Sequence, residues 1–207
     1  MRHSESFKAL TDTLKLAVAT LREAGVPFVL GGSLATWARG GPEPENDLDL
    51  MVRPSDAEAA LQALADVGMR PERPPEEWLY KAFNGEVMID VIFEPSGLEI
   101  DDPVFERAET LSVMAVATPV MALEDVLVTM LCSLEERRLD YSRLVAIARS
   151  LREQVDWPGL WARTSGSPYA KAFSVLVQEL GIVERHAGSH GAHASRVRVL
   201  PSSNSPR

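Results

Sequence analysis

The segment DLDLMV at residues 47–52 places two carboxylates one residue apart within an otherwise apolar run. Strict alternation of this kind predicts a β-strand, in which every second side chain lies on the same face. Asp47 and Asp49 are then expected on one face, while Leu48 and Leu50 point into the core. The strand therefore carries two acids toward one spot.

The N-terminal half alternates predicted helices and strands. Apolar residues three and four apart from Phe7 to Leu21 predict an amphipathic helix that ends at Gly25. Ser55 and Glu58 match a capping box at the start of the next long helix. The remaining expected elements are a strand over 27–30, one or two helical turns over 33–39, a helix over 56–68, and strands over 47–52, 78–83, 86–93 and 111–117.

Asn84-Gly85 lies between two of these strands and is a strong signal for a two-residue hairpin turn. With these two residues as the loop, Phe83 is expected to pair with Glu86. Lys81 then lies diagonally near Asp90, on the only face of the hairpin that carries charge.

The C-terminal half has helical periodicity. Thr118-Pro119 predicts a helix start with the proline at its first position, and MALEDVLVTMLCSLEE continues from it. Further helices are expected over 141–152, 158–164 and 168–180, with Asp140, Asp156 and Ser167 as N-caps and Gly181 as a stop. Trp157 and Trp161 are expected to pack these helices together or to line an acceptor pocket, and Glu124 and Asp125 to suit the dipole of their helix.

These elements predict an α/β (α+β) fold: a mixed, partly antiparallel sheet with flanking helices, followed by a C-terminal helical bundle. The expected domains are 1–117, containing the sheet, and a helical region over 118–185. Residues 186–207 are rich in Gly, Ser, His and Arg without an acid, and we expect a disordered tail there.

Charge and composition argue against three classes of protein: nucleic-acid-binding, membrane-spanning and disulfide-rich. The formal net charge of −9 argues against a broad nucleic-acid-binding face. No stretch approaches the ~20 apolar residues of a membrane helix, and the N-terminus lacks the apolar core of a signal peptide, so we expect a cytoplasmic protein without a membrane partner. The single cysteine, Cys132, excludes a disulfide framework and is expected to be a small core residue.

Two carboxylates on one face raise each other's pKa unless a cation joins them, and a divalent cation with hard oxygen ligands, such as Mg²⁺, suits Asp47 and Asp49. A solvated strand edge is the alternative. Asp90 lies in the apolar strand EVMIDVIF, where an unpaired carboxylate is costly, so it needs a partner. That partner is either the same cation or Lys81, in a purely structural ion pair.

Gly31-Gly32-Ser33 follows a strand and opens a helix. Free backbone N–H groups at a helix start bind anions, and glycine lets a phosphate come close. The order strand, GGS, helix, D-x-D strand, and a later strand with a lone Asp is far more specific than any of its parts.

This pattern resembles the polymerase-β-type nucleotidyltransferase superfamily. Its signature of an hG[GS] turn, a [DE]h[DE]h strand and a third carboxylate on a separate strand corresponds here to Leu30-Gly31-Gly32, Asp47-Leu48-Asp49-Leu50 and Ile89-Asp90-Val91. The layout of the helical half is similar to small bacterial members, including abortive-infection-like proteins and aminoglycoside- or lincosamide-modifying enzymes. Here, however, Ser33 follows the second glycine, and VLVTMLCS lacks the lysine of many toxin-like relatives.

The resemblance implies a two-metal transfer of a nucleoside monophosphate (NMP) from an NTP, with ATP as the expected donor, to an acceptor hydroxyl with release of pyrophosphate. Asp47, Asp49 and Asp90 would bind two Mg²⁺ ions, with Mn²⁺ as an alternative, and Asp90 would take the hydroxyl proton. The expected nucleotide-binding residues are Gly31, Gly32, Ser33 and Lys81. Arg39 is expected to be solvated or structural, with neutralisation of the triphosphate as the alternative. The expected acceptor is a small molecule.

Three other hypotheses for the function stay open. One is a toxin- or antitoxin-type relative that acts on RNA or protein. Another is a non-catalytic nucleotide-binding partner of another chain. The last is an unrelated metal-dependent α/β protein whose acids meet by coincidence.

Overall fold

The computed structural model describes residues 2–45 and 47–184. In chain order its elements are α1 (Arg2–Glu23), β1 (Val29–Leu30), α2 (Gly32–Ala38), β2 (Asp47–Met51), η1 (Pro54–Asp56), α3 (Ala57–Asp66), β3 (Arg70–Glu72), β4 (Leu79–Asn84), β5 (Val87–Ile92), α4 (Asp102–Glu106), β6 (Glu109–Val113), β7 (Val116–Val120), α5 (Leu123–Cys132), η2 (Glu136–Arg138), α6 (Ser142–Leu151), η3 (Arg152–Gln154), α7 (Trp157–Arg163) and α8 (Pro168–Glu179). The tail expected from residue 186 lies outside the described residues.

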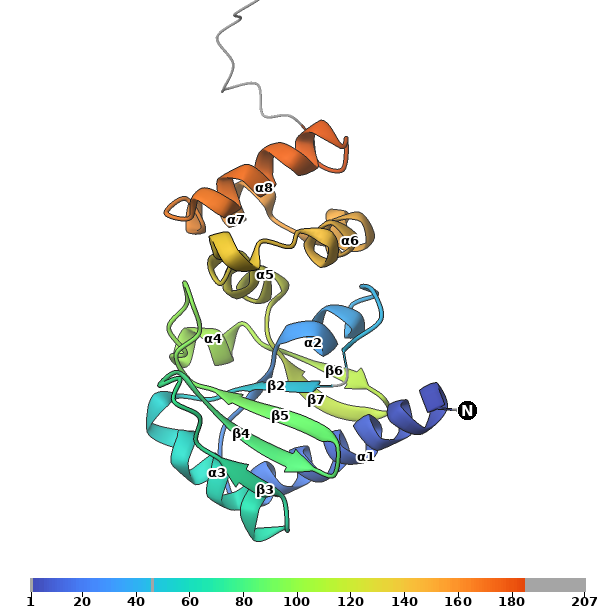
Figure 1. Cartoon of the computed structure of the whole chain (residues 1–207), viewed down its shortest axis with the longest axis vertical. Coiled ribbons are helices and arrows are strands. Elements are labelled where there is room, and N and C mark those ends of the chain that lie inside the picture. Colours follow the sequence, from blue (N-terminus) through green and yellow to red (C-terminus); the bar gives the residue numbers. More distant parts are fainter. Residues whose placement is uncertain (1, 46, 185–207) are drawn as a thin grey trace, which may run out of the picture.

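The strands form one mixed sheet in the order β3-β4-β5-β2-β1-β7-β6. The β5–β2 and β1–β7 pairs are parallel and the other neighbours are antiparallel. Helices α1 and α3 cover one face, and α2 and α4 lie toward the other, below the group α5–α8 (Figure 1). The predicted fold class, a mixed sheet with flanking helices followed by a helical bundle, is confirmed.

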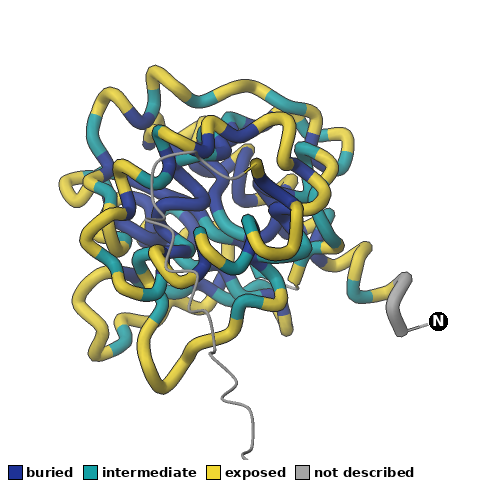
Figure 2. Tube along the Cα trace, turned by 90° about the horizontal axis from the view of Figure 1, so that it is seen from above, coloured by how far each residue is buried: buried dark blue, intermediate teal, exposed yellow. Residues whose placement is uncertain are grey.

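The core forms where the predicted apolar faces meet. Leu10, Leu14, Val18 and Leu21 of α1 are buried, as their spacing predicts. Leu48 and Leu50 of β2 are buried in the same cluster. The buried residues occupy the interior of the molecule, beneath exposed loops and helix faces (Figure 2). Among the described helices, none has both the length and the apolar character that crossing a membrane requires.

Four predicted helix signals are confirmed. Gly25 and Gly181 have positive φ angles of 68° and 65° just beyond α1 and α8. The Asp156 and Ser167 side chains accept hydrogen bonds from the Gly159 and Ala170 backbone N–H groups. The capping box is wrong: Ser55 lies inside η1, the helix α3 begins at Ala57, and its N-cap makes no side-chain bond.

Two predictions around residue 115 are also wrong. The single strand expected over 111–117 is a hairpin of β6 and β7, with Met114 and Ala115 at positive φ angles of 49° and 64° in its turn. These residues lack the Gly or Asn that marks such a turn, which hides it in the sequence. Thr118 and Pro119 belong to β7 rather than to a helix start, and α5 begins at Leu123.

The β4–β5 hairpin differs from the prediction in register. Asn84 pairs with Val87, so that Gly85 and Glu86 form the turn. Lys81 consequently lies directly opposite Asp90 instead of diagonal to it. The shift of two positions keeps every side chain on its predicted face.

The helices α5–α8 form a second buried cluster, and Leu98 and Met130 pack against both clusters. We refer to α5–α8 with their connecting segments as the helical region. The sheet ends at Val120, close to the predicted boundary at 117/118, and the division into a 1–117 domain and a 118–185 region stays a prediction.

Asp125 joins the sheet to the helical region. Its carboxylate is fully buried. Oδ2 accepts hydrogen bonds from Arg107 Nε at 3.1 Å and Nη2 at 2.9 Å, and Oδ1 accepts one from Arg163. Arg107 caps α4 and Arg163 lies in α7, so one side chain ties α4, α5 and α7 together. The prediction that Asp125 only suits the dipole of its helix is therefore incomplete, because the carboxylate also pairs with two arginines.

We expect Asp125→Ala to lower the free energy of unfolding by about 1.5–3 kcal/mol, because it removes the charge-assisted hydrogen bonds that join Arg107 and Arg163 to α5, while both arginines stay in contact with water. Urea denaturation measures this change. Asp12→Asn is the control, since Asp12 pairs with Lys8 on the open surface at 2.8 Å and its loss should have no measurable effect. Equal midpoints for the two variants would contradict the assigned role of Asp125.

Candidate active site

The parallel pairing of β2 and β5 brings the three predicted carboxylates to one side of the sheet. Asp49 is the register partner of Asp90, and Asp47 is the partner of Met88. Paired strands lie about 4.8 Å apart. The carboxylates are half-buried, and the alternating Leu48 and Leu50 are fully buried on the opposite face. The predicted gathering of Asp47, Asp49 and Asp90 is thus found.

Their proximity shifts their acidities. The pKa of Asp49 is raised to about 7, first by burial and then by the charges of Asp47 and Asp90. Burial likewise raises the pKa of Asp47, with further contributions from Glu45 and Asp90. In the described part of the chain, Asp47 Oδ1 is buried without a hydrogen-bond partner.

Asp90 has a partner within the protein. Lys81 Nζ donates a hydrogen bond to Asp90 Oδ1 at 2.7 Å, and the two side chains are only 22% and 13% exposed. An ion pair this sheltered from water holds the Asp90 carboxylate in place. Both arrangements predicted for Asp90, near the other acids and beside Lys81, therefore occur together.

The glycine turn packs directly on the D-x-D strand. The Gly31 backbone N–H donates to Asp49 O at 2.8 Å, and α2 begins at Gly32 with a φ of +55°. A Cβ on Gly32 would come within 1.7 Å of Asp49 Oδ2. Hydrogen bonding from the Ser33 backbone partly offsets the rise in the pKa of Asp49. Gly32 is required here both by its backbone conformation and by the carboxylate beside it.

Ser33 contributes its backbone to this site rather than its hydroxyl. The side chain is buried, and Ser33 Oγ accepts a hydrogen bond from the Glu45 backbone N–H at 3.1 Å. The hydroxyl thus holds the loop that leads into β2.

A cavity of about 850 Å³ lies between the sheet and the helical region and includes part of this site. From the sheet half it is lined by Gly32, Asp49, Lys81 and Asp90, together with residues of the 76–79 and 92–96 segments. From the helical half it is lined by Thr129, Met130, Ser133, Leu134, Glu135 and Arg138. The size is typical of a pocket for a small molecule.

The donor set has the chemistry of a Mg²⁺ site. Carboxylate oxygens are the ligands that Mg²⁺ prefers, and a cation beside Asp47 and Asp49 would relieve their repulsion and satisfy the unpartnered Asp47 Oδ1. Among residues 2–45 and 47–184, however, no group of three or more His, Cys, Asp or Glu side chains is arranged to hold a metal ion. Asp47 and Asp49 therefore fit Mg²⁺, whereas Asp90 already uses one carboxylate oxygen, Oδ1, to accept a hydrogen bond from Lys81.

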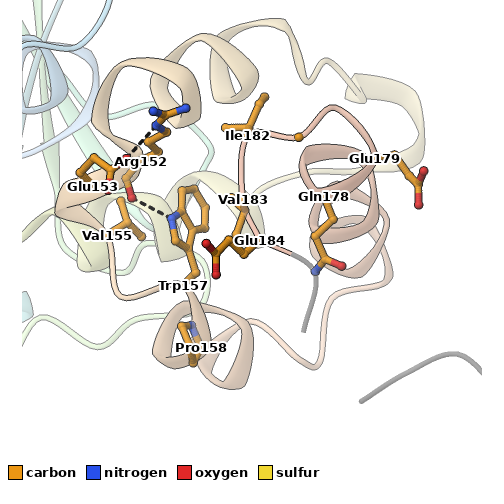
Figure 3. Close-up of a pocket in the computed structure, with 11 residues that line it drawn as sticks. Arg152, Glu153, Val155, Trp157, Pro158, Gln178, Glu179, Ile182, Val183 and Glu184 are labelled. Atoms are coloured by element: carbon orange, nitrogen blue, oxygen red, sulfur yellow. Dashed lines mark hydrogen bonds and ion pairs between the residues drawn. The ribbon is translucent and has the colours of Figure 1, made fainter. Parts of the chain in front are cut away.

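A second cavity, of about 870 Å³, lies within the helical region, away from the carboxylates (Figure 3). Trp157 lines it and donates from its indole N–H to Arg152 O at 2.9 Å. Trp157 is buried in the cluster of α5–α8, and the Trp161 ring centroid lies 6.3 Å from that of Phe173 in α8, so the expectation that they pack the helices is met. The alternative, a wall of the pocket next to the carboxylates, does not apply to them, because neither lines that cavity.

Other predicted residues have structural positions. Arg39 is nearly buried, donates to Met121 O at 3.1 Å and pairs with Glu109 at 3.3 Å, as a structural role predicts. Cys132 is half-buried, and burial raises the pKa of its thiol, which suits a packing residue.

Arg143 of α6 was not predicted to belong to the site. It pairs with Glu45 at 3.0 Å, and its charge lowers the pKa of Asp47. Nothing local marks this arginine, because its partner lies 98 residues earlier in the chain.

The fold and these carboxylates define a nucleotidyltransferase-like protein, and comparison identifies the family. The chain belongs to a family described as uncharacterised nucleotidyltransferases, whose model matches residues 8–178. No curated protein matches the sequence.

Several solved structures share the fold. The solution structure of the antibiotic-resistance factor ANT(2'')-Ia is 12% identical over 83% of this chain and 96% of its own, with a TM-score of 0.58. A crystal structure of ANT(2'')-Ia in complex with adenylyl-2''-tobramycin is 14% identical over 79% of this chain and 98% of its own, with a TM-score of 0.54. The lincomycin-bound lincosamide antibiotic adenylyltransferase LnuA is 14% identical over 72% and 97%, with a TM-score of 0.50.

Gly32→Ala should destabilise the protein by about 1–3 kcal/mol more than Gly85→Ala, because the new methyl group overlaps the Asp49 carboxylate. Both glycines have similar positive φ angles, of 55° and 62°, and a Cβ at Gly85 meets nothing within 4 Å. The two variants therefore share the backbone strain and differ in the clash. Chemical denaturation of both measures the difference, and equal losses would show that Asp49 moves aside freely.

Asp49 should make stability depend on pH. Because its folded-state pKa is about 7 and the usual value is 3.8, the folded state binds more protons than the unfolded state between these values. The free energy of unfolding should therefore fall as the pH rises from about 4 to about 7. Asp49→Asn should flatten this fall, whereas Asp66→Asn, on the exposed side of α3, should leave it in place. An unchanged slope in Asp49→Asn would contradict the shifted pKa.

Proposed function

We propose that the protein transfers an NMP group from an NTP, with ATP as the expected donor, to a hydroxyl group of a small molecule. The hydroxyl oxygen forms a bond to the α-phosphorus of the NTP. The bond between that phosphorus and the oxygen that bridges the α- and β-phosphates breaks, and pyrophosphate leaves. The observation that carries the proposal is the position of Asp49 and Asp90, which lie on paired strands and line the cavity beside the glycine turn.

Each residue has a proposed role. The backbone of Gly31, Gly32 and Ser33 lets the triphosphate approach the sheet. Asp47, Asp49 and Asp90 would hold Mg²⁺, or Mn²⁺ in its place, which supplies positive charge for the phosphates and lowers the pKa of a coordinated hydroxyl.

Asp90 is the proposed acceptor of the hydroxyl proton, since it lines the cavity and its carboxylate is held by Lys81. Lys81 also lines the cavity, so a small movement of its flexible side chain would bring its charge to the phosphates. We propose that it binds nucleotide in this way while staying near Asp90.

The cavity walls favour a small molecule over RNA as acceptor. Three glutamates line the cavity and make no ion pair with another described residue: Glu76, Glu94 and Glu135. Arg138 is the one base of the lining in the described chain that also lacks an ion pair. Such walls repel a polyanion. The structures of ANT(2'')-Ia with adenylyl-2''-tobramycin and of LnuA with lincomycin support a small-molecule acceptor by analogy of fold.

Incubation with each α-labelled NTP, Mg²⁺ and fractions of a small-molecule extract tests the proposal. We expect transfer of label to a low-mass product, and its loss in the double variant Asp47→Asn, Asp49→Asn. Mg²⁺ and the preferred NTP should also raise the melting temperature, since a hundredfold excess over Kd stabilises a protein by about 2.7 kcal/mol. Absence of both effects with all four NTPs would overturn the proposal, and label on RNA or protein would overturn the choice of acceptor.

The Asp90→Asn variant separates an enzyme from a nucleotide-binding protein without turnover. A proton-accepting Asp90 predicts a fall in turnover of at least ~10²-fold with nucleotide binding retained. An Asp90 that serves only as the partner of Lys81 predicts a loss of stability with full activity per folded molecule. Melting temperature, nucleotide affinity and label transfer on this one variant distinguish the two.

A further inference from the structure

The loop between α2 and β2 connects the glycine turn to the first carboxylate, and the helical region holds it by polar contacts. Gln154 Nε2, from η3, donates to Arg39 O at 3.1 Å. Arg143, from α6, donates through Nη1 to Glu45 Oε1 at 3.0 Å and through Nη2 to Glu43 O at 3.4 Å. Figure 1 shows this loop, in blue, extending from the end of α2 toward α6.

Glu45 is held from two sides. Its backbone N–H donates to Ser33 Oγ in α2, and its carboxylate accepts from Arg143 in α6. Two residues further on, the chain enters β2 at Asp47. The segment that delivers Asp47 to the site is therefore set by a contact with the glycine turn and by a contact with the helical region.

Arg143 and Asp47 each retain one unsatisfied atom. Arg143 Nε and Asp47 Oδ1 are both buried and have no hydrogen-bond partner within the described chain. A buried polar atom in this state is costly, and ligands or bound water usually satisfy it. The Arg143 donor and the Asp47 acceptor are therefore free to bond a ligand or a bound water.

Stability alone does not account for the Arg143–Glu45 pair. Glu45 is 61% exposed and Arg143 is 27% exposed, and ion pairs with so much contact to water add little to folding. The pair adds little to the free energy of folding, but Glu45 lies two residues before Asp47, so the pair fixes the segment that places this carboxylate.

We propose that Arg143 is a positioning residue: by gripping the loop at Glu43 and Glu45, it sets the Asp47 carboxylate for cation and nucleotide binding and couples the helical region to the sheet. The expected effect of Arg143 on turnover rests on the proposed function. Its contact with the loop at Glu43 and Glu45 can be measured without any activity. A planar guanidinium makes both contacts at once, which a lysine ammonium does not reproduce.

The test compares Arg143→Met, Arg143→Lys, Glu45→Gln and the double variant Arg143→Met, Glu45→Gln with Arg149→Met. Arg149 lies on the exposed side of the same helix, so its loss matches the change in charge without touching the loop. The readouts are melting temperature, amide hydrogen exchange over residues 43–49, the Mg²⁺ concentration that half-saturates the NTP-induced thermal shift, and kcat/KM.

We expect Arg143→Met to keep a melting temperature close to that of the wild type, while its amide hydrogens over residues 43–49 exchange faster. The NTP-induced thermal shift should require more Mg²⁺. The value of kcat/KM should fall about tenfold or more, because a misplaced group lowers the rate on this scale. Glu45→Gln should resemble this variant, and the double variant should lose no more than Arg143→Met, because both changes remove one contact. Arg143→Lys should recover only part, and Arg149→Met should match the wild type.

Two outcomes overturn the proposal. Unchanged exchange over residues 43–49 in Arg143→Met would show that the arginine does not hold the loop. Additive losses in the double variant, with the Mg²⁺ requirement unchanged, would show that Arg143 acts independently of Glu45, as a direct phosphate contact does. If the wild type shows no NTP response while Arg143→Met still exchanges faster, the proposed function fails and the grip on the loop stands.

Discussion

The parallel pairing of β2 with β5 determines where the three acids of the site lie. It places Asp49 opposite Asp90 and leaves Asp47 one step along the same face. Three like charges gathered at the edge of a core repel one another, and burial raises the cost of each. Much of the surrounding structure offsets this repulsion.

The offsets come from separate parts of the chain. Lys81 neutralises Asp90 from β4, the Ser33 backbone bonds Asp49 from α2, and the charge of Arg143 acts on Asp47 from α6. Even so, the pKa of Asp49 stays near 7 and Asp47 keeps an unpartnered oxygen. Such residual strain is typical of sites that a cation or substrate completes.

The helical region contributes to this site in two ways. Asp125, buried between Arg107 and Arg163, ties α5, which forms part of the far wall of the cavity, to α4 and α7. Arg143 then reaches the loop that leads into β2. The Asp125 contact is buried and supports stability. The Arg143 contact is partly exposed, and we propose that it positions Asp47.

The sequence alone determined the elements that carry the site and the side of the strand on which each acid lies. Alternation in DLDLMV places Asp47 and Asp49 on one face whatever the partner strand is, and helical spacing predicts the apolar face of α1. The turn at Gly31-Gly32 was predictable because glycines between a strand and a helix mark a tight turn, and Gly32 has the left-handed backbone that glycine tolerates. These inferences depend on local geometry, which neighbouring residues encode.

Only the tertiary structure decided the rest, because it depends on residues far apart in sequence. The β4–β5 register differs by two positions from the one predicted from Asn84-Gly85, and the β6–β7 turn at Met114 and Ala115 carries no turn signal. Asp125 could be read as a residue favourable to the helix dipole until Arg107 and Arg163 were found around it. Glu45 and Arg143 meet across 98 residues, and such a contact arises when two separately packed layers come together, since no periodicity along the chain records it.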